Sequence, residues 1–120
     1  MKRILVVDDS RFVRNFHINL LKAAGFKADD AADGVEALEK SLSAPYDLIL
    51  CDINMPNMDG LRFAEKYREE EKETPIIIIS TQEDAAHKQK AVEAGANLYI
   101  VKPVKPNSLV LHVKMLLGSN

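Results

Sequence analysis

Residues 4–9 read Ile-Leu-Val-Val-Asp-Asp, an apolar run that stops abruptly at two carboxylates. Three similar apolar runs follow along the chain, at residues 48–51, 76–79 and 98–101. Continuous runs of aliphatic residues are typical of parallel strands that helices cover on both faces. We therefore predict four buried strands, and a weaker strand at residues 26–31, where Asp29 and Asp30 indicate the edge of a sheet.

Between these runs, apolar residues repeat at the spacing of amphipathic helices. Five helices are predicted, and the apolar residues that mark them are Val13, Phe16, Leu20 and Leu21, then Val35, Leu38 and Leu42, then Leu61, Ala64 and Tyr67, then Ala85, Ala91, Val92 and Ala94, and finally Leu109, Val113, Leu116 and Leu117. Gly25 and Gly95 are expected to end the first and fourth helices. This alternation predicts an α/β fold, with one five-stranded, doubly wound parallel sheet and helices on both faces.

Composition limits the classes of protein that fit. The chain has 120 residues, so we expect a single domain over residues 1–120. Its 16 Lys and Arg against 18 Asp and Glu argue against an extended nucleic-acid surface. Its apolar runs are far shorter than the ~20 residues of a membrane-spanning helix. Cys51 is the one cysteine and cannot form an internal disulfide, which favours a reducing, cytoplasmic location.

The functional crevice of such a sheet lies at the carboxyl ends of its strands. The polar residues that follow the predicted strands there are Asp8 and Asp9, Asp52, Ser80 and Thr81, and Lys102. Clustered carboxylates repel one another, and a hard divalent cation such as Mg²⁺ relieves the repulsion through oxygen ligands. A carboxylate is also a competent nucleophile toward phosphorus, and a lysine and a hydroxyl suit a phosphoryl group. The pattern therefore indicates Mg²⁺-dependent phosphoryl transfer.

These residues resemble the motifs of response-regulator receiver domains. The matching segments are residues 4–10, 52–60, 75–80 and 94–96 and the pair Lys102–Pro103, in that family's order and spacing. The segment from Asp52 to Gly60 is especially similar to single-domain chemotaxis regulators. The resemblance covers essentially the whole chain and implies a flavodoxin-like (βα)5 fold with strand order 2-1-3-4-5.

The resemblance also implies a role for each residue at the acidic site. Asp52 is expected to accept the phosphoryl group. Asp9 and Asp52 would ligate Mg²⁺ directly, Asp8 would reach it through water, and Asn54 would supply its backbone carbonyl. Lys102 would pair with the carboxylates and later with the phosphoryl group.

Three further expectations follow from the resemblance. Ser80 would be the switch hydroxyl, and Tyr99 the aromatic residue that changes rotamer with it. Thr81 stands where the family often has Ala, and its bulk is expected to limit the inward movement of Tyr99. The bond between Lys102 and Pro103 is expected to be cis.

The function implied is that of a signalling receiver and not of a metabolic enzyme. A histidine kinase would supply the phosphoryl group, and the chain would catalyse only its own phosphorylation and dephosphorylation. The fourth helix, fifth strand and fifth helix would then change to control a protein target, such as a flagellar-motor switch or a histidine phosphotransfer protein. We expect a monomer or a phosphorylation-dependent dimer, with no direct contact to nucleic acid or membrane.

The fifth helix carries a candidate contact surface for that target. At about 100° per residue, Leu111 and Met115 fall opposite the side of the helix that faces the sheet. Basic side chains of the fourth helix lie nearby in the predicted fold: His87, Lys88 and Lys90. We predict a partner surface that is apolar at Leu111 and Met115 and has a basic rim.

Several alternatives remain open from the sequence alone. A phosphorelay intermediate, or a receiver that belongs to a longer regulator, would carry the same motifs. A flavodoxin-like cofactor carrier shares the fold, although Asp8 and Asp9 would repel a flavin phosphate. The site residues also have purely structural explanations, with Asp8 and Asp9 or Ser80 and Thr81 as helix caps and Tyr99 as a core aromatic.

Overall fold

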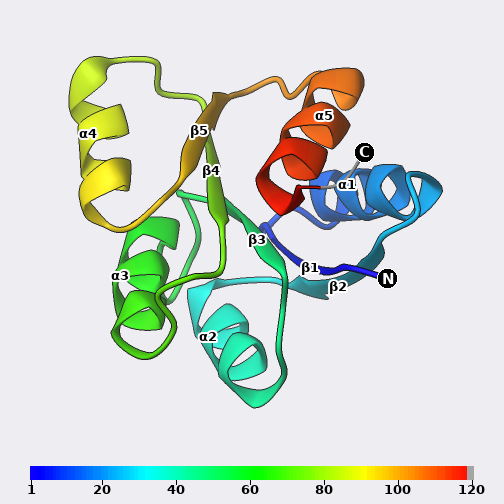
Figure 1. The fold of residues 1–120 in the computed structure, drawn as a ribbon. Coiled ribbons are helices and arrows are strands. Elements are labelled where there is room, and N and C mark those ends of the chain that lie inside the picture. Colours follow the sequence, from blue (N-terminus) through cyan, green and yellow to red (C-terminus); the bar gives the residue numbers. More distant parts are fainter. Residues whose placement is uncertain (119–120) are drawn as a thin grey trace.

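The computed structural model describes residues 1–118, in which a parallel sheet lies between two layers of helices (Figure 1). The strands are β1 (Arg3–Val7), β2 (Lys27–Ala31), β3 (Leu48–Asp52), β4 (Ile76–Ser80) and β5 (Leu98–Val101). The helices are α1 (Arg11–Ala23), α2 (Gly34–Ser43), α3 (Gly60–Glu70), α4 (Ala85–Glu93) and α5 (Pro106–Leu117). The strand order β2-β1-β3-β4-β5 confirms the predicted flavodoxin-like topology. Within residues 1–118, no helix combines the length and apolarity needed to cross a membrane.

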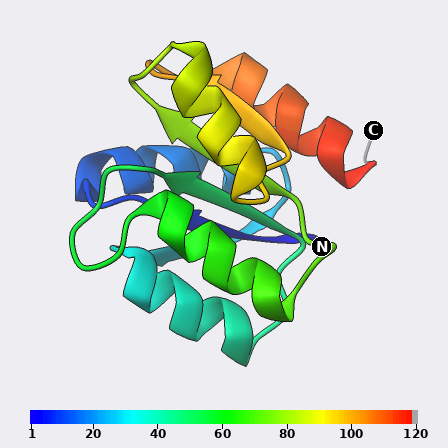
Figure 2. The ribbon, with the colours of Figure 1, turned by 90° about the vertical axis from the view of Figure 1, so that its left-hand side faces the viewer.

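The two faces of the sheet form two separate cores. Helices α1 and α5 cover one face, and α2, α3 and α4 cover the other (Figure 1, Figure 2). Because side chains alternate along a strand, Ile4 and Val6 of β1 point into the α1–α5 core, while Leu5 and Val7 point into the opposite core. This alternation explains why the central strands are apolar except at one terminal residue each, which is Arg3 in β1, Asp52 in β3 and Ser80 in β4.

The two edge strands differ from the central ones. All four residues of β5 are only half-buried, so the prediction that this strand is buried on both faces was wrong. Its one neighbour in the sheet is β4, and one side of the strand remains open. The predicted edge position of β2 is confirmed.

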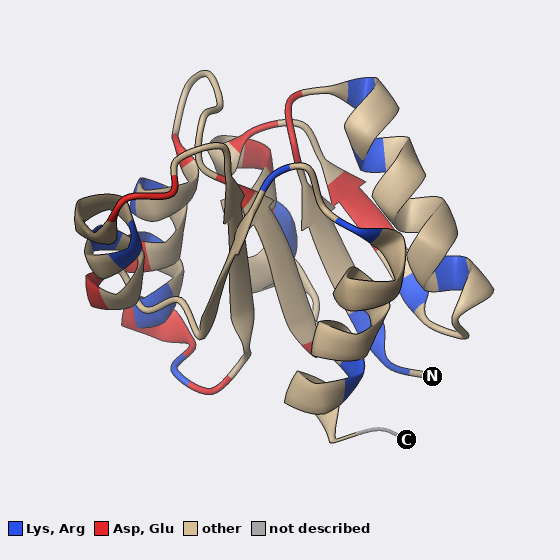
Figure 3. Ribbon diagram, turned by 90° about the horizontal axis from the view of Figure 1, so that it is seen from above, with Lys and Arg blue, Asp and Glu red and all other residues tan. Residues whose placement is uncertain are grey.

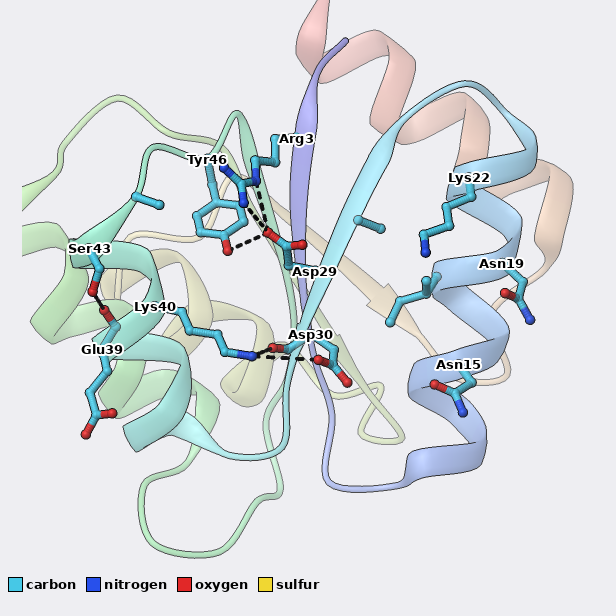
Figure 4. A pocket seen from close by; sticks show the side chains of 13 residues that line it. Arg3, Asn15, Asn19, Lys22, Asp29, Asp30, Glu39, Lys40, Ser43 and Tyr46 are labelled. Carbon is cyan, nitrogen blue, oxygen red and sulfur yellow. Dashed lines mark hydrogen bonds and ion pairs between the residues drawn. The ribbon is translucent and has the colours of Figure 1, made fainter.

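Charged side chains of neighbouring elements pair with the carboxylates of β2 (Figure 4). Asp29 accepts hydrogen bonds from Arg3 Nε at 2.9 Å and from the Tyr46 hydroxyl at 2.8 Å. Asp30 lies 3.7 Å from Lys40 Nζ. A hollow of about 780 Å³ opens beside this strand between α1 and α2, and both of its aspartates are already paired.

Four helices begin at a polar cap. The side chains that accept a backbone N–H of the first turn are Ser10, Asp33, Asp59 and Asp84, for α1 to α4 respectively. Helix α5 has no such side-chain bond and places Pro106 in its first turn instead. The alternatives in which Asp8 and Asp9 or Ser80 and Thr81 cap helices were therefore wrong.

Several apolar residues that mark the helices do not face the sheet. Exposed fractions are 44% for Phe16, 40% for Val35, 50% for Leu42 and 61% for Val92. Helix α1 buries Leu21, as predicted, and also His17, while α2 buries Ala37 and Ser41, which the pattern did not mark. The small side chains of α2 allow a close approach to the sheet, which a pattern based on hydrophobicity alone does not reveal.

Replacing Phe63 by alanine tests the core between the sheet and helices α2, α3 and α4, which we call the α2–α4 core. The Phe63 ring is fully buried and stacks on Tyr67 with ring centroids 5.6 Å apart. We expect the free energy of unfolding to fall by about 3–5 kcal/mol, because the truncation leaves a cavity. Phe12→Ala is the matched control, since Phe12 is 82% exposed and its loss should stay below about 0.5 kcal/mol. Urea denaturation measures both free energies of unfolding, and equal decreases for Phe63→Ala and Phe12→Ala would contradict this packing.

Candidate phosphoryl-acceptor site

Acidic segments occupy the loops at the carboxyl ends of the strands, at the upper edge of Figure 3. Asp52 is the last residue of β3, and Asp8 follows β1 directly. Carboxylate oxygens of Asp8, Asp9 and Asp52 lie within 4.8 Å of one another. The fold therefore brings together the three carboxylates that were predicted to share this edge.

The cluster is buried on one side. Asp8 is 1% exposed and Asp52 is 5% exposed, whereas Asp9 faces solvent. Asp8 Oδ1 accepts the backbone N–H of Ser10 at 2.9 Å. Asp8 Oδ2 is buried and has no hydrogen-bond partner within the described part of the chain. Its nearest positive charge is Lys102 Nζ at 3.7 Å, beyond hydrogen-bond distance. A buried carboxylate oxygen that accepts no hydrogen bond is costly, so this atom indicates a place for a further cation or its bound water.

Lys102 supplies the positive charge of the site. Its Nζ donates to Asp52 Oδ2 at 3.2 Å and lies 3.7 Å from Asp8 Oδ2. The backbone N–H of Lys102 donates to the carbonyl of Ser80 at 2.8 Å, which anchors the lysine to the end of β4. The bond between Lys102 and Pro103 is cis, as predicted. One ammonium faces three carboxylates, so the cluster keeps an excess of negative charge.

Burial shifts the proton affinity of Asp52. It raises the pKa of Asp52 above its ordinary value, the Lys102 ammonium works in the opposite direction, and the Asp8 charge adds to the rise. Burial likewise raises the pKa of the Cys51 thiol, and the charges of Asp52 and Asp8 act in the same direction. Cys51 therefore stays protonated and serves as a small apolar residue beneath the site.

The oxygen donors at this edge fit a hard divalent cation. Asp8, Asp9 and Asp52 offer carboxylate oxygens within reach of one another, and one of the buried oxygens lacks a donor. Asn54 lies two residues beyond Asp52 in the exposed loop between β3 and α3. The ligand role of its backbone carbonyl remains a prediction.

The side chains of Ser80 and Tyr99 both form a hydrogen bond with the backbone of Gln82, which the sequence did not indicate. Ser80 is 1% exposed, and its Oγ accepts the backbone N–H of Gln82 at 3.1 Å. The Tyr99 hydroxyl donates to the backbone carbonyl of the same Gln82 at 2.8 Å. Tyr99 also packs against the α2–α4 core, so its structural explanation holds beside the predicted switch role. Gln82 contributes backbone atoms only, and these leave no signal in a sequence.

Gly60 allows helix α3 to begin directly beside Asp52. A Cβ atom at this position would lie 2.1 Å from the backbone carbonyl oxygen of Asp52, so a side chain does not fit. The N–H of Gly60 donates to the carbonyl of Ile53 at 2.8 Å. The loop that follows Asp52 thus closes on itself before the helix starts.

Comparison with known families agrees with this geometry. Residues 4–114 match the response regulator receiver domain, and the chain belongs to that family. It is the receiver domain of a two-component response regulator, a signalling module. This membership confirms the resemblance drawn from the motifs and argues against the cofactor-carrier alternative.

Curated relatives are about twice as long as this chain. The transcriptional regulatory protein ResD of Bacillus subtilis (strain 168) is 43% identical over 115 residues, which are 96% of this chain and 48% of ResD. The transcriptional regulatory protein SrrA of Staphylococcus aureus is 40% identical over 114 residues, which are 95% of this chain and 47% of SrrA. The chain therefore spans about half the length of these relatives.

Solved structures of similar proteins cover the whole fold. The Vibrio cholerae chemotaxis protein CheY4 superimposes with a TM-score of 0.92 and 36% identity, over 97% of this chain and 98% of that one. A CheY-like receiver domain protein from Methanospirillum hungatei JF-1 gives a TM-score of 0.94 and 30% identity, over 98% and 94% of the two chains. Single-domain chemotaxis regulators are thus among its structural neighbours, as the motif segment indicated.

The raised pKa of Asp52 predicts how stability depends on pH without metal. A carboxyl with a higher pKa in the folded state binds more protons when folded, so stability falls as pH rises between the two pKa values. The fall begins near the unfolded pKa of about 3.9. Asp52→Asn removes this ionisation, and we expect the variant to gain stability over the wild type as pH rises from about 3.5 to 7.

Denaturation at a series of pH values in metal-free buffer measures this difference. Glu65→Gln is the control, because Glu65 is an exposed carboxylate on α3 and should give no such gain. A difference between Asp52→Asn and wild type that stays constant with pH would contradict the shifted ionisation.

Proposed function

We propose that this receiver accepts a phosphoryl group from a histidine kinase onto Asp52, in a Mg²⁺-dependent reaction that the chain catalyses on itself. The observation that carries this proposal is the convergence of opposite charges at the edge of the sheet. Oxygens of Asp8, Asp9 and Asp52 lie within 4.8 Å, and Lys102 Nζ lies 3.2 Å from Asp52. The Oδ2 of Asp8 accepts no hydrogen bond and has only the Lys102 ammonium at 3.7 Å, which supports a bound cation.

In the proposed reaction, a carboxylate oxygen of Asp52 attacks phosphorus. The bond between phosphorus and the kinase imidazole breaks, and the imidazole nitrogen keeps the electron pair. Asp9, Asp52 and the carbonyl of Asn54 would hold Mg²⁺ directly, with Asp8 acting through water. The cation would neutralise charge on the phosphoryl oxygens. The Lys102 ammonium would then move from the carboxylates to pair with the phosphoryl oxygens.

Phosphorylation would replace the single charge of the Asp52 carboxylate by roughly two negative charges on the phosphoryl oxygens, next to Ser80 and Lys102. We infer that the Ser80 hydroxyl turns to donate to a phosphoryl oxygen and gives up the N–H of Gln82. Because Tyr99 holds the carbonyl of that same residue, a shift of Gln82 changes the restraint on Tyr99. The β4–α4 loop and β5 would then move between two populations.

An apolar hollow beside the acceptor supports a protein phosphodonor. Its volume is about 370 Å³, and its lining includes Phe12 and Phe16 of α1, Lys102, Pro103 and Val104. Phe12 is 82% exposed and Phe16 44% exposed, and exposed apolar side chains grouped around a hollow are typical of interaction sites. A kinase helix that presents a phosphohistidine could bury these rings while its imidazole approaches Asp52. A phosphorelay donor would use the same surface.

The output surface is proposed at α4, β5 and α5. Leu111 and Met115 are 57% and 67% exposed, as the helical spacing predicted. Lys88 and Lys90 of α4 are exposed as well, which supports a basic rim around an apolar contact. A chemotaxis-type protein target is our first candidate, in line with CheY4. ResD and SrrA are named transcriptional regulators, so control of transcription is the second candidate. In that case the protein to which this receiver belongs would contact DNA, against our expectation of no direct nucleic-acid binding.

Acetyl phosphate tests the proposed acceptance reaction. With Mg²⁺, intact-mass measurement should find one added phosphoryl group on the wild type and none on Asp52→Asn. Asp9→Asn should bind Mg²⁺ on the order of 10-fold or more weakly and be phosphorylated more slowly. Without metal it should be slightly more stable, by less than about 1 kcal/mol, because Asp9 is exposed and its repulsion is screened.

Two outcomes would count against the proposal. Phosphorylation of Asp52→Asn would place the acceptor elsewhere. An Asp9→Asn variant that is less stable than wild type in metal-free buffer would show that the carboxylates do not destabilise one another.

A double variant, Leu111→Ser with Met115→Ser, tests the output surface. After activation with beryllofluoride, sedimentation measures dimerisation, and titration with a flagellar-motor switch protein measures target binding. We expect at least one of these to weaken by about 10-fold or more, since apolar anchors carry most interface energy. The phosphorylation rate is the control. No change in either interaction would refute the surface, and loss of phosphorylation would mean that both residues are structural.

A further inference from the structure

The loop between β3 and α3 is fastened to the start of α2. Asn57 Nδ2 donates to Asp33 Oδ2 at 2.7 Å, and the N–H of Gly34 donates to the carbonyl of Met58 at 3.0 Å. Asp33 also caps α2, because its Oδ1 accepts the N–H of Glu36 at 2.8 Å. One carboxylate thus begins a helix with one oxygen and holds the loop with the other.

The backbone of the loop depends on these contacts. Asn57 has φ = 68°, and it is the one non-glycine residue in the left-handed region among residues 1–118. Asparagine tolerates this conformation better than most residues, and the bond to Asp33 helps to fix it. A Cβ atom on Gly34 would lie 2.4 Å from the carbonyl oxygen of Met58, so the loop packs against bare backbone at the start of α2.

Apolar contacts anchor the same loop without setting its orientation. Met55 and Met58 pack against the α2–α4 core. Flexible methionine side chains tolerate small rotations of the backbone that carries them. The loop also has internal hydrogen bonds, from Gly60 to Ile53 and from Met58 to Pro56, but its orientation relative to α2 is set by the two hydrogen bonds to that helix.

We propose that Asp33 is a positioning residue for the acceptor site. Through Asn57, it fixes the orientation of the loop that presents the carbonyl of Asn54 to the metal. This inference rests on the proposed Mg²⁺ site. It gives α2 a part in phosphoryl acceptance that neither the motifs nor the acidic cluster assign to it.

Two single variants remove the link while preserving local structure. Asp33→Ser keeps a good helix cap but loses the second acceptor oxygen. Asn57→Gly keeps the left-handed backbone but loses the donor. Asp33→Asn is the conservative variant, because its amide oxygen can cap α2 while its amide N–H₂ donates to the oxygen of a flipped Asn57 side chain.

Calorimetric titration with Mg²⁺ alone measures the effect without any phosphoryl transfer. We expect Asp33→Ser and Asn57→Gly each to bind Mg²⁺ about 10-fold more weakly. The double variant should also bind Mg²⁺ about 10-fold more weakly, and not about 100-fold, because both substitutions remove the same hydrogen bond. Asp33→Asn should bind within about twofold of wild type, since the link survives.

The outcomes separate this inference from the proposed function. A wild type that does not bind Mg²⁺ would defeat both. A wild type that binds Mg²⁺, with single variants that bind it equally well, would overturn the positioning role alone. Multiplied losses in the double variant, or a full loss in Asp33→Asn, would also overturn it. Thermal unfolding without metal confirms that each variant is folded before titration.

Discussion

Repulsion between buried carboxylates at the carboxyl edge of the sheet is the constraint on which the site depends. Asp8 and Asp52 are almost fully buried, and Lys102 is the ammonium in contact with both. The carboxylate oxygens of this cluster lie within 4.8 Å of one another, and charges so close interact strongly when water is excluded. Burial is the main cause of the raised pKa of Asp52; the Lys102 ammonium offsets part of it, and the Asp8 charge adds to the rise. The same imbalance supports the proposed cation site, and a phosphoryl group on Asp52 would be a large local change in charge.

Neighbouring elements turn this local charge into a property of the whole domain. The backbone N–H of Lys102 is bonded to Ser80, and Ser80 and Tyr99 both bond to Gln82. Because Lys102 also bonds to Asp52, strands β4 and β5 are linked to that carboxylate. On the other side, the loop after Asp52 is bonded to α2. The charge cluster is therefore held by elements from both ends of the sheet, and a change within it has a route to the α4–β5–α5 surface.

Sequence patterns predicted the features that depend on local order. The apolar runs gave the strands, and the parallel topology placed Asp8, Asp9, Asp52 and Lys102 at one edge. Features that depend on distant neighbours were missed. The half-burial of β5 follows from its place in the sheet, since its residues are as apolar as those of a central strand. The shared bonds to Gln82 use backbone atoms, and the bond between Asp33 and Asn57 joins residues far apart in the chain, so neither has a sequence signature.

The most direct test of the central claim is amide NMR of the protein titrated with beryllofluoride, a phosphoryl analogue, in the presence and absence of Mg²⁺. The acidic cluster and Lys102 should bind the analogue only with Mg²⁺. Resonances of residues next to Asp52 should then shift together with those of Ser80, Gln82 and Tyr99, and α4 and α5 should follow. Binding that ignores Mg²⁺, or shifts that leave Gln82 and Tyr99 unchanged while Asp52 is saturated, would contradict the account.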